Sequence, residues 1–537
     1  MTKQREPEDG QARLIGCDDP LVLATGGPGS GKTQAALLLA KRLLEAEPAG
    51  STRNVLFLTF SRAATRELLE RTPGLVPKTL RQRLEITTFH GYARNILESF
   101  GRFNGRGLQP LTIASRTEVK LKLAPPGSVT LDQLVPEAVA LLNASPWVRD
   151  RLSRRLVAVI SDEYQDTGND HQQLLALLSA QSRLLCLADP NQMIYDFRGD
   201  VSPQRLTELR ARNPTEIALE QRSYRDPTGL IPRVARAIHD RQFADPALQE
   251  ALRSGRLRVR TNTNPLFAGA VEEVRALRIA GHRSVGVFVS QRFMVEELGR
   301  ELGAAKIEHE IAGLDDAAGE AETVISAMAL YATGQTTWDE VCQRMAVFLT
   351  SAQPKHDVPE VAWMLIGSRQ YLPGGLPARL LALQNSLDHL AAKPIGELFP
   401  LASDFMHLFE WGHRLWGIGS RDLAGQVAAI IREPLSEQTA VTIDAVAQRR
   451  QGESNVDEIV GNRLPVRLMT TFQAKGREMD AIVLVHHPED IIKANEHAKI
   501  QRVHFVAISR ARQTVSIVLP PDVNLFLLPY RALGQAQ

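Results

Sequence analysis

A glycine-rich stretch near the amino terminus, TGGPGSGKT, has the composition and spacing of a phosphate-binding loop. It follows a short apolar run and precedes a helix-like segment, QAALLLAKRLLEAE. Glycines let the backbone curl so that successive N–H groups face phosphate oxygens at a helix amino terminus. The lysine would reach the β and γ phosphates of a nucleotide, and the threonine hydroxyl would bind Mg²⁺. The predicted nucleotide-binding residues here are Gly26, Gly29, Ser30, Gly31, Lys32 and Thr33.

A second candidate site follows an apolar, β-branched run at 156–160, where Asp162 and Glu163 stand next to each other. The carboxyl end of a strand is where an α/β sheet presents chemistry. We expect Asp162 to hold the hydration shell of Mg²⁺ and Glu163 to orient and activate a water molecule, so that hydrolysis results. Taken alone, the pair could equally be an acidic turn that caps the next helix. Combined with the glycine-rich loop, the pair favours a nucleotide hydrolase.

Length and composition limit the class of protein. A chain of 537 residues exceeds one hydrophobic core and predicts two or more domains of about 100 to 200 residues each. Hydrophobic residues make up 44% of the chain and charged residues 23%, without an 18-residue apolar run that could span a bilayer. The first ten residues lack the apolar segment of a secretory signal. We therefore expect a cytoplasmic protein with no membrane partner.

Cysteine usage and charge narrow the possible cofactors and partners. The chain has three cysteines, Cys17, Cys186 and Cys342, which lie far apart and form no CxxC pair. This spacing argues against a disulfide framework, a zinc ribbon and an iron–sulfur cluster. Because the net charge is only +2, a nucleic-acid partner would have to be held by a local groove rather than by a globally basic body.

Further motifs occur in an order that resembles the UvrD/Rep/PcrA group of superfamily 1 DNA helicases, in a compact form. The resemblance covers most of the chain. After the glycine-rich loop, the matching stretches are LTFSRAAT (58–65), ITTFHGYARNIL (86–97), DEYQDT (162–167), ADPNQMIYDFRG (188–199), LEQRSYR (219–225), MTTFQAKGREMD (469–480) and RVHFVAISRAR (502–512).

The resemblance implies that the nucleotide is ATP and assigns further residues to its site. Gln11 would read the adenine edge, and Tyr224 would stack on the adenine ring. Gln192 would form a hydrogen bond toward the γ-phosphate and its water. Glu478 would contact the ribose or the interface between two lobes.

Two arginines in the later motifs, Arg225 and Arg510, are the candidates for arginine fingers. A guanidinium offers a fork of donors that can stabilise charge on the transferring phosphoryl group. Both motifs belong to a second lobe, so these contacts require the two lobes to close on the nucleotide. Closure on ATP binding and release on hydrolysis would be a hinge-type switch coupled to stepping along a strand.

The same family implies a path for a single DNA strand. Base–aromatic stacking contributes about 1–3 kcal/mol per base and tolerates any sequence, which suits a motor that steps along DNA. The aromatic candidates could instead be core side chains, and His90 could be a buried core histidine. The predicted DNA-binding residues are Phe60, Arg62, His90, Tyr195, Phe197, Arg198 and Thr470.

The motif at 469–480 is one of those that depart from the family pattern. Phe472 stands three residues before Lys475, where the family usually carries a histidine. The departure implies that one polar relay near the ATP–DNA interface is absent or is replaced by Gln473.

The motif order and the coarse periodicity predict an α/β fold: two RecA-like, parallel-sheet P-loop domains with mostly helical inserted domains. The family names the first lobe 1A and the second 2A, with insertions 1B and 2B, and both insertions are short here. The predicted boundaries are 1–100 and 150–224 for 1A, 101–149 for 1B, 225–315 and 456–537 for 2A, and 316–455 for 2B.

The resulting hypothesis is an ATP-dependent single-stranded DNA translocase and DNA helicase that acts on single-stranded and tailed duplex DNA, with 3′–5′ polarity taken from the resemblance alone. An alternative is a DNA- or nucleotide-sensing ATPase subunit that regulates a partner nuclease, as in Gabija-type antiviral defence systems. DNA repair is a further possible pathway. A small-molecule kinase is disfavoured, because Glu163, Gln192 and the two candidate fingers form a hydrolysis set.

Overall fold

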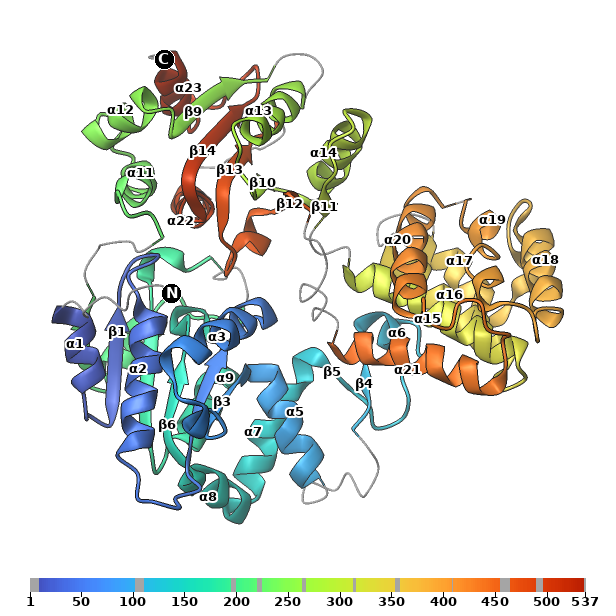
Figure 1. Ribbon diagram of the computed structural model, residues 1–537, viewed down its shortest axis with the longest axis horizontal. Coiled ribbons are helices and arrows are strands. Elements are labelled where there is room, and N and C mark those ends of the chain that lie inside the picture. The colour runs from blue at the N-terminus through green and yellow to red at the C-terminus, as the bar shows by residue number, and fades with distance from the viewer. Residues whose placement is uncertain are drawn as a thin grey trace. The chain divides into compact units, whose positions relative to one another are not determined.

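The computed structural model describes residues 9–101, 111–194, 199–219, 225–262, 267–311, 315–352, 358–407, 409–453, 464–488 and 496–535 (Figure 1). The chain divides into two compact units. The first, here the two-sheet unit, comprises Met1–Leu111, Asp132–Ala312 and Asn462–Gln537. The second, here the helical unit, comprises Thr112–Leu131 and Gly313–Gly461.

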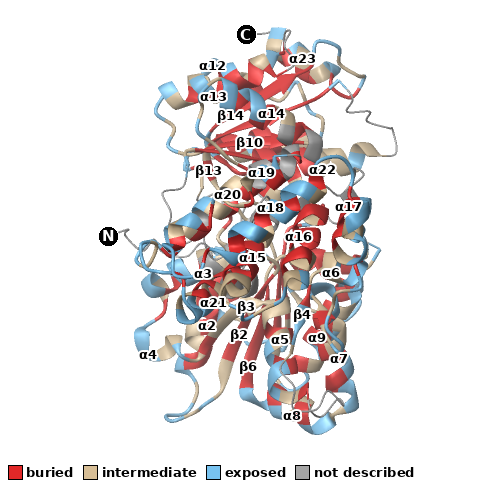
Figure 2. Cartoon of the chain, turned by 90° about the vertical axis from the view of Figure 1, so that its right-hand side faces the viewer, coloured by how far each residue is buried: buried red, intermediate tan, exposed pale blue. Residues whose placement is uncertain are grey.

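The first sheet has six strands, all parallel. Its four central strands are apolar along most of their length and are coloured mainly as buried in Figure 2, which is typical of a parallel sheet covered on both faces, whereas the two edge strands carry more polar residues. In the strand Asn54–Thr59, Val55 and Phe57 belong to the core cluster on one face, while Leu56 and Leu58 are buried on the other. The strand order is β3 (Leu84–Thr88), β2 (Asn54–Thr59), β6 (Leu156–Ser161), β7 (Arg183–Ala188), β1 (Leu21–Thr25) and β8 (Thr215–Ala218).

Helices connect these strands and complete the core of the first sheet. In α2, apolar residues such as Leu37, Leu44 and Ala40 lie on one stripe and pack against the strands. The helices are α1 (Asp9–Gly16), α2 (Lys32–Glu45), α3 (Arg62–Leu75), α4 (Lys78–Arg81), α5 (Phe89–Phe100), α7 (Leu134–Ala144), α8 (Pro146–Arg155), α9 (Asn169–Leu178) and α10 (Arg205–Arg210).

The second sheet repeats this design with six parallel strands, in the order β11 (Glu310–Ile311), β12 (Val466–Thr470), β10 (Val285–Val289), β13 (Met479–Val485), β14 (Ala511–Leu519) and β9 (Leu257–Thr261). Its helices are α11 (Leu230–His239), α12 (Pro246–Arg253), α13 (Ala268–Ile279), α14 (Arg292–Ala304), α22 (His497–Ile508) and α23 (Leu528–Gln535). The predicted α/β class, with two parallel sheets and helical insertions, is confirmed.

The helical unit contains α6 (Arg116–Lys120), a short parallel pair formed by β4 (Ile113–Ala114) and β5 (Val129–Thr130), and helices from the long second insertion. Its remaining helices are α15 (Asp315–Ala332), α16 (Trp338–Ala352), α17 (Val358–Gly367), α18 (Leu376–Asp388), α19 (Ser403–Met406), α20 (Glu410–Gln426) and α21 (Glu437–Glu453). No helix in the described part of the chain is both long enough and apolar enough to cross a bilayer.

Polar contacts join the two chain segments of the helical unit. Ser115 caps α6, and Glu118 closes the capping box by accepting a hydrogen bond from the Ser115 backbone N–H. The other carboxylate oxygen of Glu118 pairs with Arg344 of α16 at 3.0 Å, and the hydroxyls of Thr117 and Ser351 lie 3.1 Å apart. Residues 112–131, from the segment predicted as 1B, thus cluster with residues 313–461. The predicted domain boundaries stay a prediction.

Replacement of Glu118 by alanine tests this junction. The substitution removes both the capping box and the pair with Arg344, and we expect it to destabilise α6 in its packed position by about 1–2 kcal/mol. Hydrogen exchange of the α6 and β4 amides in the full chain should become faster. Lys120→Ala, an exposed change on the same helix, is the matched control, and equal exchange rates in the two variants would contradict the junction.

Candidate functional site

The glycine-rich loop lies between β1 and α2, as a phosphate-binding loop requires. Gly29 and Gly31 have φ angles of 75° and 82°, in the left-handed region that glycine adopts without a steric penalty. Gly26 is restricted in another way, because a Cβ at this position would lie 2.6 Å from the Ser30 hydroxyl oxygen. These glycines let the loop fold tightly around the amino terminus of α2, which begins at Lys32.

Two predicted nucleotide-binding side chains contact this loop. Lys32 donates from its Nζ to the carbonyl oxygens of Gly26, at 2.5 Å, and Gly27, at 3.1 Å. Gln11, from α1, donates from its Nε2 to the Ser30 carbonyl oxygen at 2.9 Å. The structure therefore brings Gln11 and Lys32 to the same loop from two different helices.

The acidic pair lies opposite the loop, at the carboxyl end of β6. The Thr33 hydroxyl is 3.4 Å from the Oδ2 of Asp162, so a hydroxyl and a carboxylate oxygen, both groups that Mg²⁺ accepts, stand together. No cluster of three or more His, Cys, Asp or Glu ligands occurs within the described ranges. The donor set fits Mg²⁺ that takes its remaining ligands from phosphate oxygens and water.

Glu163 is held in an unusual backbone conformation next to Asp162. Its φ of 51° lies in the left-handed region, which costs a non-glycine residue on the order of 1–3 kcal/mol. Its backbone N–H donates to Asp162 Oδ1 at 3.0 Å, and its carboxylate accepts a hydrogen bond of 2.5 Å from Gln165 Nε2. These contacts fix the direction of the carboxylate that we predict to activate water.

Charge and burial shift the pKa values of Asp162 and Glu163 in opposite directions. Removal from water, followed by the negative charge of Glu163, raises the pKa of Asp162 to about 6. Burial also acts to raise the pKa of Glu163, but the positive charges of Lys475, Lys32 and Arg510 outweigh it and lower that pKa below its ordinary value. Both groups are therefore mainly ionised at neutral pH, as metal binding and proton acceptance require.

Gln192 links the first sheet to the second. Its amide nitrogen donates to Asp189 Oδ2 at 2.6 Å, and its amide oxygen accepts a hydrogen bond from the Arg510 guanidinium. Arg510 is only 4% exposed. Burial and then the positive charge of Arg225 lower its pKa to about 10, so it stays protonated at neutral pH. The structure thus brings the predicted finger Arg510 to the predicted γ-phosphate sensor.

Lys475 is a site residue that the sequence interpretation missed. Its ammonium group donates to the Asp166 carboxylate and, at 3.0 Å, to the Gln192 carbonyl oxygen. It also lies 3.4 Å from Glu163 Oε2. Its place in the motif at 469–480 was an available signal, but sequence alone gave it no partner. Arg502, which donates to the Met193 carbonyl oxygen at 2.7 Å, was missed in the same way.

A second ionic cluster surrounds Glu478. One of its oxygens accepts from Arg225 at 2.7 Å and lies 3.7 Å from Arg71 of α3, while the other accepts from Arg512 at 2.9 Å. Burial opposes ionisation of this carboxylate, but the charges and hydrogen bonds of Arg225 and Arg512 lower its pKa to about 2. Arg225 also donates to the Ser509 carbonyl oxygen at 2.6 Å. Glu478 therefore holds the other predicted finger, and Arg71 is a further contact that the sequence did not indicate.

Two predicted DNA-binding side chains lie together at the edge of the first sheet. Phe60 directly follows β2, and His90 lies in the first turn of α5. The two residues are close in space because Thr59 and Thr88, which precede them, are register partners at the carboxyl ends of adjacent strands. The Phe60 ring is 5.3 Å from the His171 ring, and the His90 ring is 5.9 Å from it.

The other DNA-binding candidates are more dispersed. Thr470 ends β12 in the second sheet, where its backbone N–H and its hydroxyl donate to Gln473 Oε1 at 2.9 and 3.0 Å. Gln473 thus caps the turn that follows β12. Tyr195, Phe197, Arg198 and Tyr224 lie outside the described residues, as does the side chain of Arg62.

The Glu478 cluster predicts a pH-dependent contribution to stability. Because the folded pKa lies below the ordinary value, the contribution is present above about pH 4.5 and is lost as the pH falls toward 2. Glu478→Gln should lower the free energy of unfolding by about 2–3 kcal/mol at pH 7, and the difference should narrow below pH 4.5. Urea unfolding at several pH values measures both. The exposed Glu301→Gln is the control, and a pH-independent difference would contradict the prediction.

Known relatives of the chain are ATP-dependent DNA helicases by name. It is 27% identical over 283 residues to PcrA of Bacillus subtilis (strain 168), covering 41% of this chain and 37% of PcrA. It is 23% identical over 296 residues to UvrD1 of Mycobacterium tuberculosis (strain ATCC 25618 / H37Rv), covering 42% and 38%. It is 34% identical over 110 residues to Rep of Salmonella typhimurium, covering 20% and 16%. The chain spans less than two fifths of the length of each of these relatives.

A family model also matches the part of the chain that contains five of the six strands of the first sheet. The model for the UvrD/REP helicase N-terminal domain matches residues 7–125 and 115–209. This region contains the glycine-rich loop, the Asp162–Glu163 pair and Gln192, and the relatives above come from the same group. Residues 7–209 are therefore similar to the N-terminal domain of UvrD/REP helicases, and Arg510 and Lys475, which lie next to strands of the second sheet, contact the polar groups of this region.

Proposed function

We propose that this protein is an ATP-dependent single-stranded DNA translocase and 3′–5′ DNA helicase. The observation that carries the proposal is the contact of two cations from the second sheet with the polar groups of the first. Arg510 donates to the Gln192 side chain, and Lys475 lies 3.4 Å from Glu163. Such contacts allow ATP hydrolysis at the first sheet to be coupled to movement of the second.

The chemistry follows from the positions of these side chains. Lys32 and the loop N–H groups would hold the phosphates, while Thr33 and Asp162 would hold Mg²⁺, which neutralises charge on the β and γ phosphates when bound. Glu163 would accept a proton from the attacking water. Arg510 would stabilise the charge that develops on the transferring phosphoryl group.

The ionic contacts suggest how a bound DNA strand could control the nucleotide site. Glu478 now neutralises Arg225, and Arg71 contacts the same carboxylate from α3. The helix α3 begins two residues after Phe60, which we propose contacts DNA. A shift of α3 on strand binding would therefore change the contacts of Glu478 and release Arg225 toward the phosphates.

Charge supports a nucleic-acid partner for the two-sheet unit. Its three segments carry 50 Lys and Arg against 41 Asp and Glu, a net charge of +9, although the whole chain is only +2. Phosphate contacts supply most sequence-independent affinity for nucleic acid. Phe60 and His90 add ring faces at the sheet edge. The 3′–5′ polarity rests on the resemblance to UvrD, Rep and PcrA.

A regulatory ATPase that acts on a partner nuclease, as in Gabija-type defence, is the alternative within the same family. Both functions use the same nucleotide site. They differ in whether the chain alone couples hydrolysis to a DNA strand, so one assay separates them.

The deciding measurement is steady-state ATP hydrolysis by the full chain with and without poly-dT at low salt. We expect strong stimulation by the strand. Lys32→Ala should abolish hydrolysis, and Arg510→Ala should lower kcat by about 10³-fold or more, because an arginine finger acts in the transition state. Arg183→Ala, an ion-paired change on the surface, is the matched arginine control. ATP hydrolysis at the same rate with and without DNA would contradict the translocase proposal and favour the regulatory subunit.

Phe60→Ala tests the strand path separately from the nucleotide site. Loss of one stacking face should cost about 1–3 kcal/mol of binding to poly-dT. The concentration of poly-dT that gives half-maximal stimulation should rise, while ATP hydrolysis without DNA stays unchanged. Trp147→Ala, which removes an aromatic side chain that is 60% exposed elsewhere in the two-sheet unit, is the control. An unchanged half-maximal concentration for Phe60→Ala would remove this residue from the path.

A further inference from the structure

The two units of the chain have opposite charge. The helical unit carries 13 Lys and Arg against 20 Asp and Glu, a net charge of −7, whereas the two-sheet unit carries +9. A surface that binds the phosphate backbone of nucleic acid needs positive charge. The helical unit has the opposite sign and is suited to a positively charged partner.

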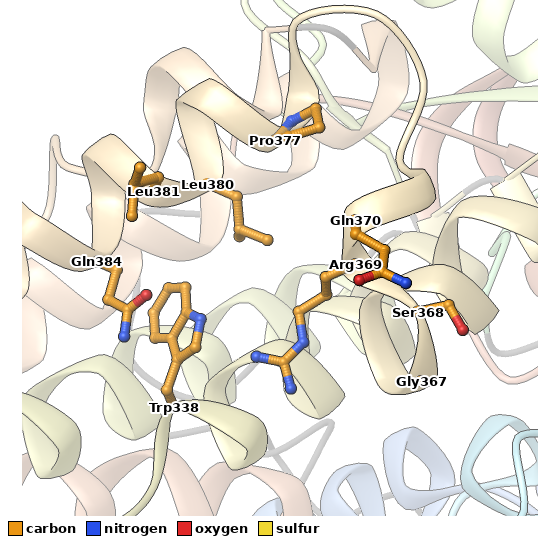
Figure 3. Close-up of a pocket in the computed structure, with 9 residues that line it drawn as sticks. All are labelled: Trp338, Gly367, Ser368, Arg369, Gln370, Pro377, Leu380, Leu381 and Gln384. Atoms are coloured by element: carbon orange, nitrogen blue, oxygen red, sulfur yellow. The ribbon is translucent and has the colours of Figure 1, made fainter.

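A pocket of about 370 Å³ opens in the helical unit between the start of α16, the end of α17 and the face of α18 (Figure 3). Its apolar wall is formed by Trp338, Pro377, Leu380 and Leu381. Its polar rim is formed by Ser368, Arg369, Gln370 and Gln384, with Gly367 completing the lining. The volume is at the small end for ligand pockets and suits one or two inserted side chains.

The charged groups at this pocket include one ion pair and one further carboxylate. Arg369 is the cation of the lining, and it is paired with Asp339. Asp388 accepts a hydrogen bond of 2.7 Å from the Tyr331 hydroxyl, and the Tyr331 ring lies 5.4 Å from the ring of Trp338. One carboxylate thus lies beside an aromatic pair, an arrangement that attracts Lys and Arg by charge and by cation–π contact.

Exposed apolar side chains lie in the pocket and next to it. Leu381 of the pocket wall is 58% exposed, and Tyr371, which directly follows Gln370, is 67% exposed. Tryptophan, tyrosine and arginine are the residue types that most often dominate the binding energy of protein interfaces. The pocket and its surroundings therefore combine an apolar anchor site with a nearby carboxylate.

We propose that this pocket docks a basic segment of a partner protein. The segment inserts one leucine or aromatic side chain between Trp338 and Leu380 and directs a lysine or arginine side chain toward Asp388. This docking goes beyond the ATP-dependent activity proposed above and does not rest on it. Single-stranded DNA is disfavoured as the occupant because its phosphates would meet this carboxylate in a unit of net charge −7.

The test is a selection of random twelve-residue peptides displayed on phage, with the full chain as the target. We expect the enriched peptides to carry several Lys or Arg residues around one leucine or aromatic residue. Fluorescein-labelled copies should bind Trp338→Ala at least about tenfold more weakly than the natural chain. Trp363→Ala is the matched control, because this tryptophan is 43% exposed on α17 and does not line the pocket.

A second variant guards against misfolding of Trp338→Ala. Leu381→Lys changes an exposed side chain of the pocket wall and adds a positive charge there, so it should weaken binding of the same peptides without affecting ATP hydrolysis. Absence of enrichment, enrichment of acidic peptides, or equal binding to the natural chain and both variants would overturn the proposal. Direct binding of a fluorescein-labelled dT oligonucleotide that Trp338→Ala weakens would also overturn it, since the pocket would then belong to nucleic acid.

Discussion

Two cations from the second sheet, Lys475 and Arg510, hold together the polar groups on which the site depends. Each would be costly to bury without a partner. Arg510 donates a hydrogen bond to the Gln192 amide oxygen. Lys475 donates to the Asp166 carboxylate and forms an ion pair with Glu163. The positive charges also keep Glu163 ionised in spite of its surroundings. The same contacts therefore offset the cost of burying two cations and keep the Glu163 carboxylate ready to accept a proton.

In the Glu478 cluster, positive charges likewise keep a buried carboxylate ionised, and here the result is that an arginine is held in place. Three arginines converge on one carboxylate, and its pKa falls to about 2. A carboxylate with so low a pKa remains a reliable anion over the whole physiological range. Arg225 is consequently held in a fixed position beside Ser509. Its position is thus set by side chains rather than by backbone geometry alone.

Sequence reasoning was strongest where a motif is local. The glycine-rich loop and the Asp162–Glu163 pair depend on neighbours within a few residues, such as the left-handed Gly29 and Gly31 and the bond from the Glu163 N–H to Asp162. Lys475 is different, because its partners lie about 280 to 310 residues away in the chain. Arg71 belongs to a helix whose sequence does not indicate which acid it meets. The joining of residues 112–131 to 313–461 was invisible for the same reason, since no periodicity encodes a contact between separate segments.

That joining has a consequence for the history of the chain. The backbone passes between the two units four times, after residues 111, 131, 312 and 461, so the helical unit is assembled from two separate segments of the chain. Loss of residues 112–131 would remove the ion pair of Arg344 with Glu118. Loss of residues 313–461 would remove the helix that α6 contacts. The two segments are therefore expected to be gained, lost or exchanged together among related genes, although they are separate in the sequence.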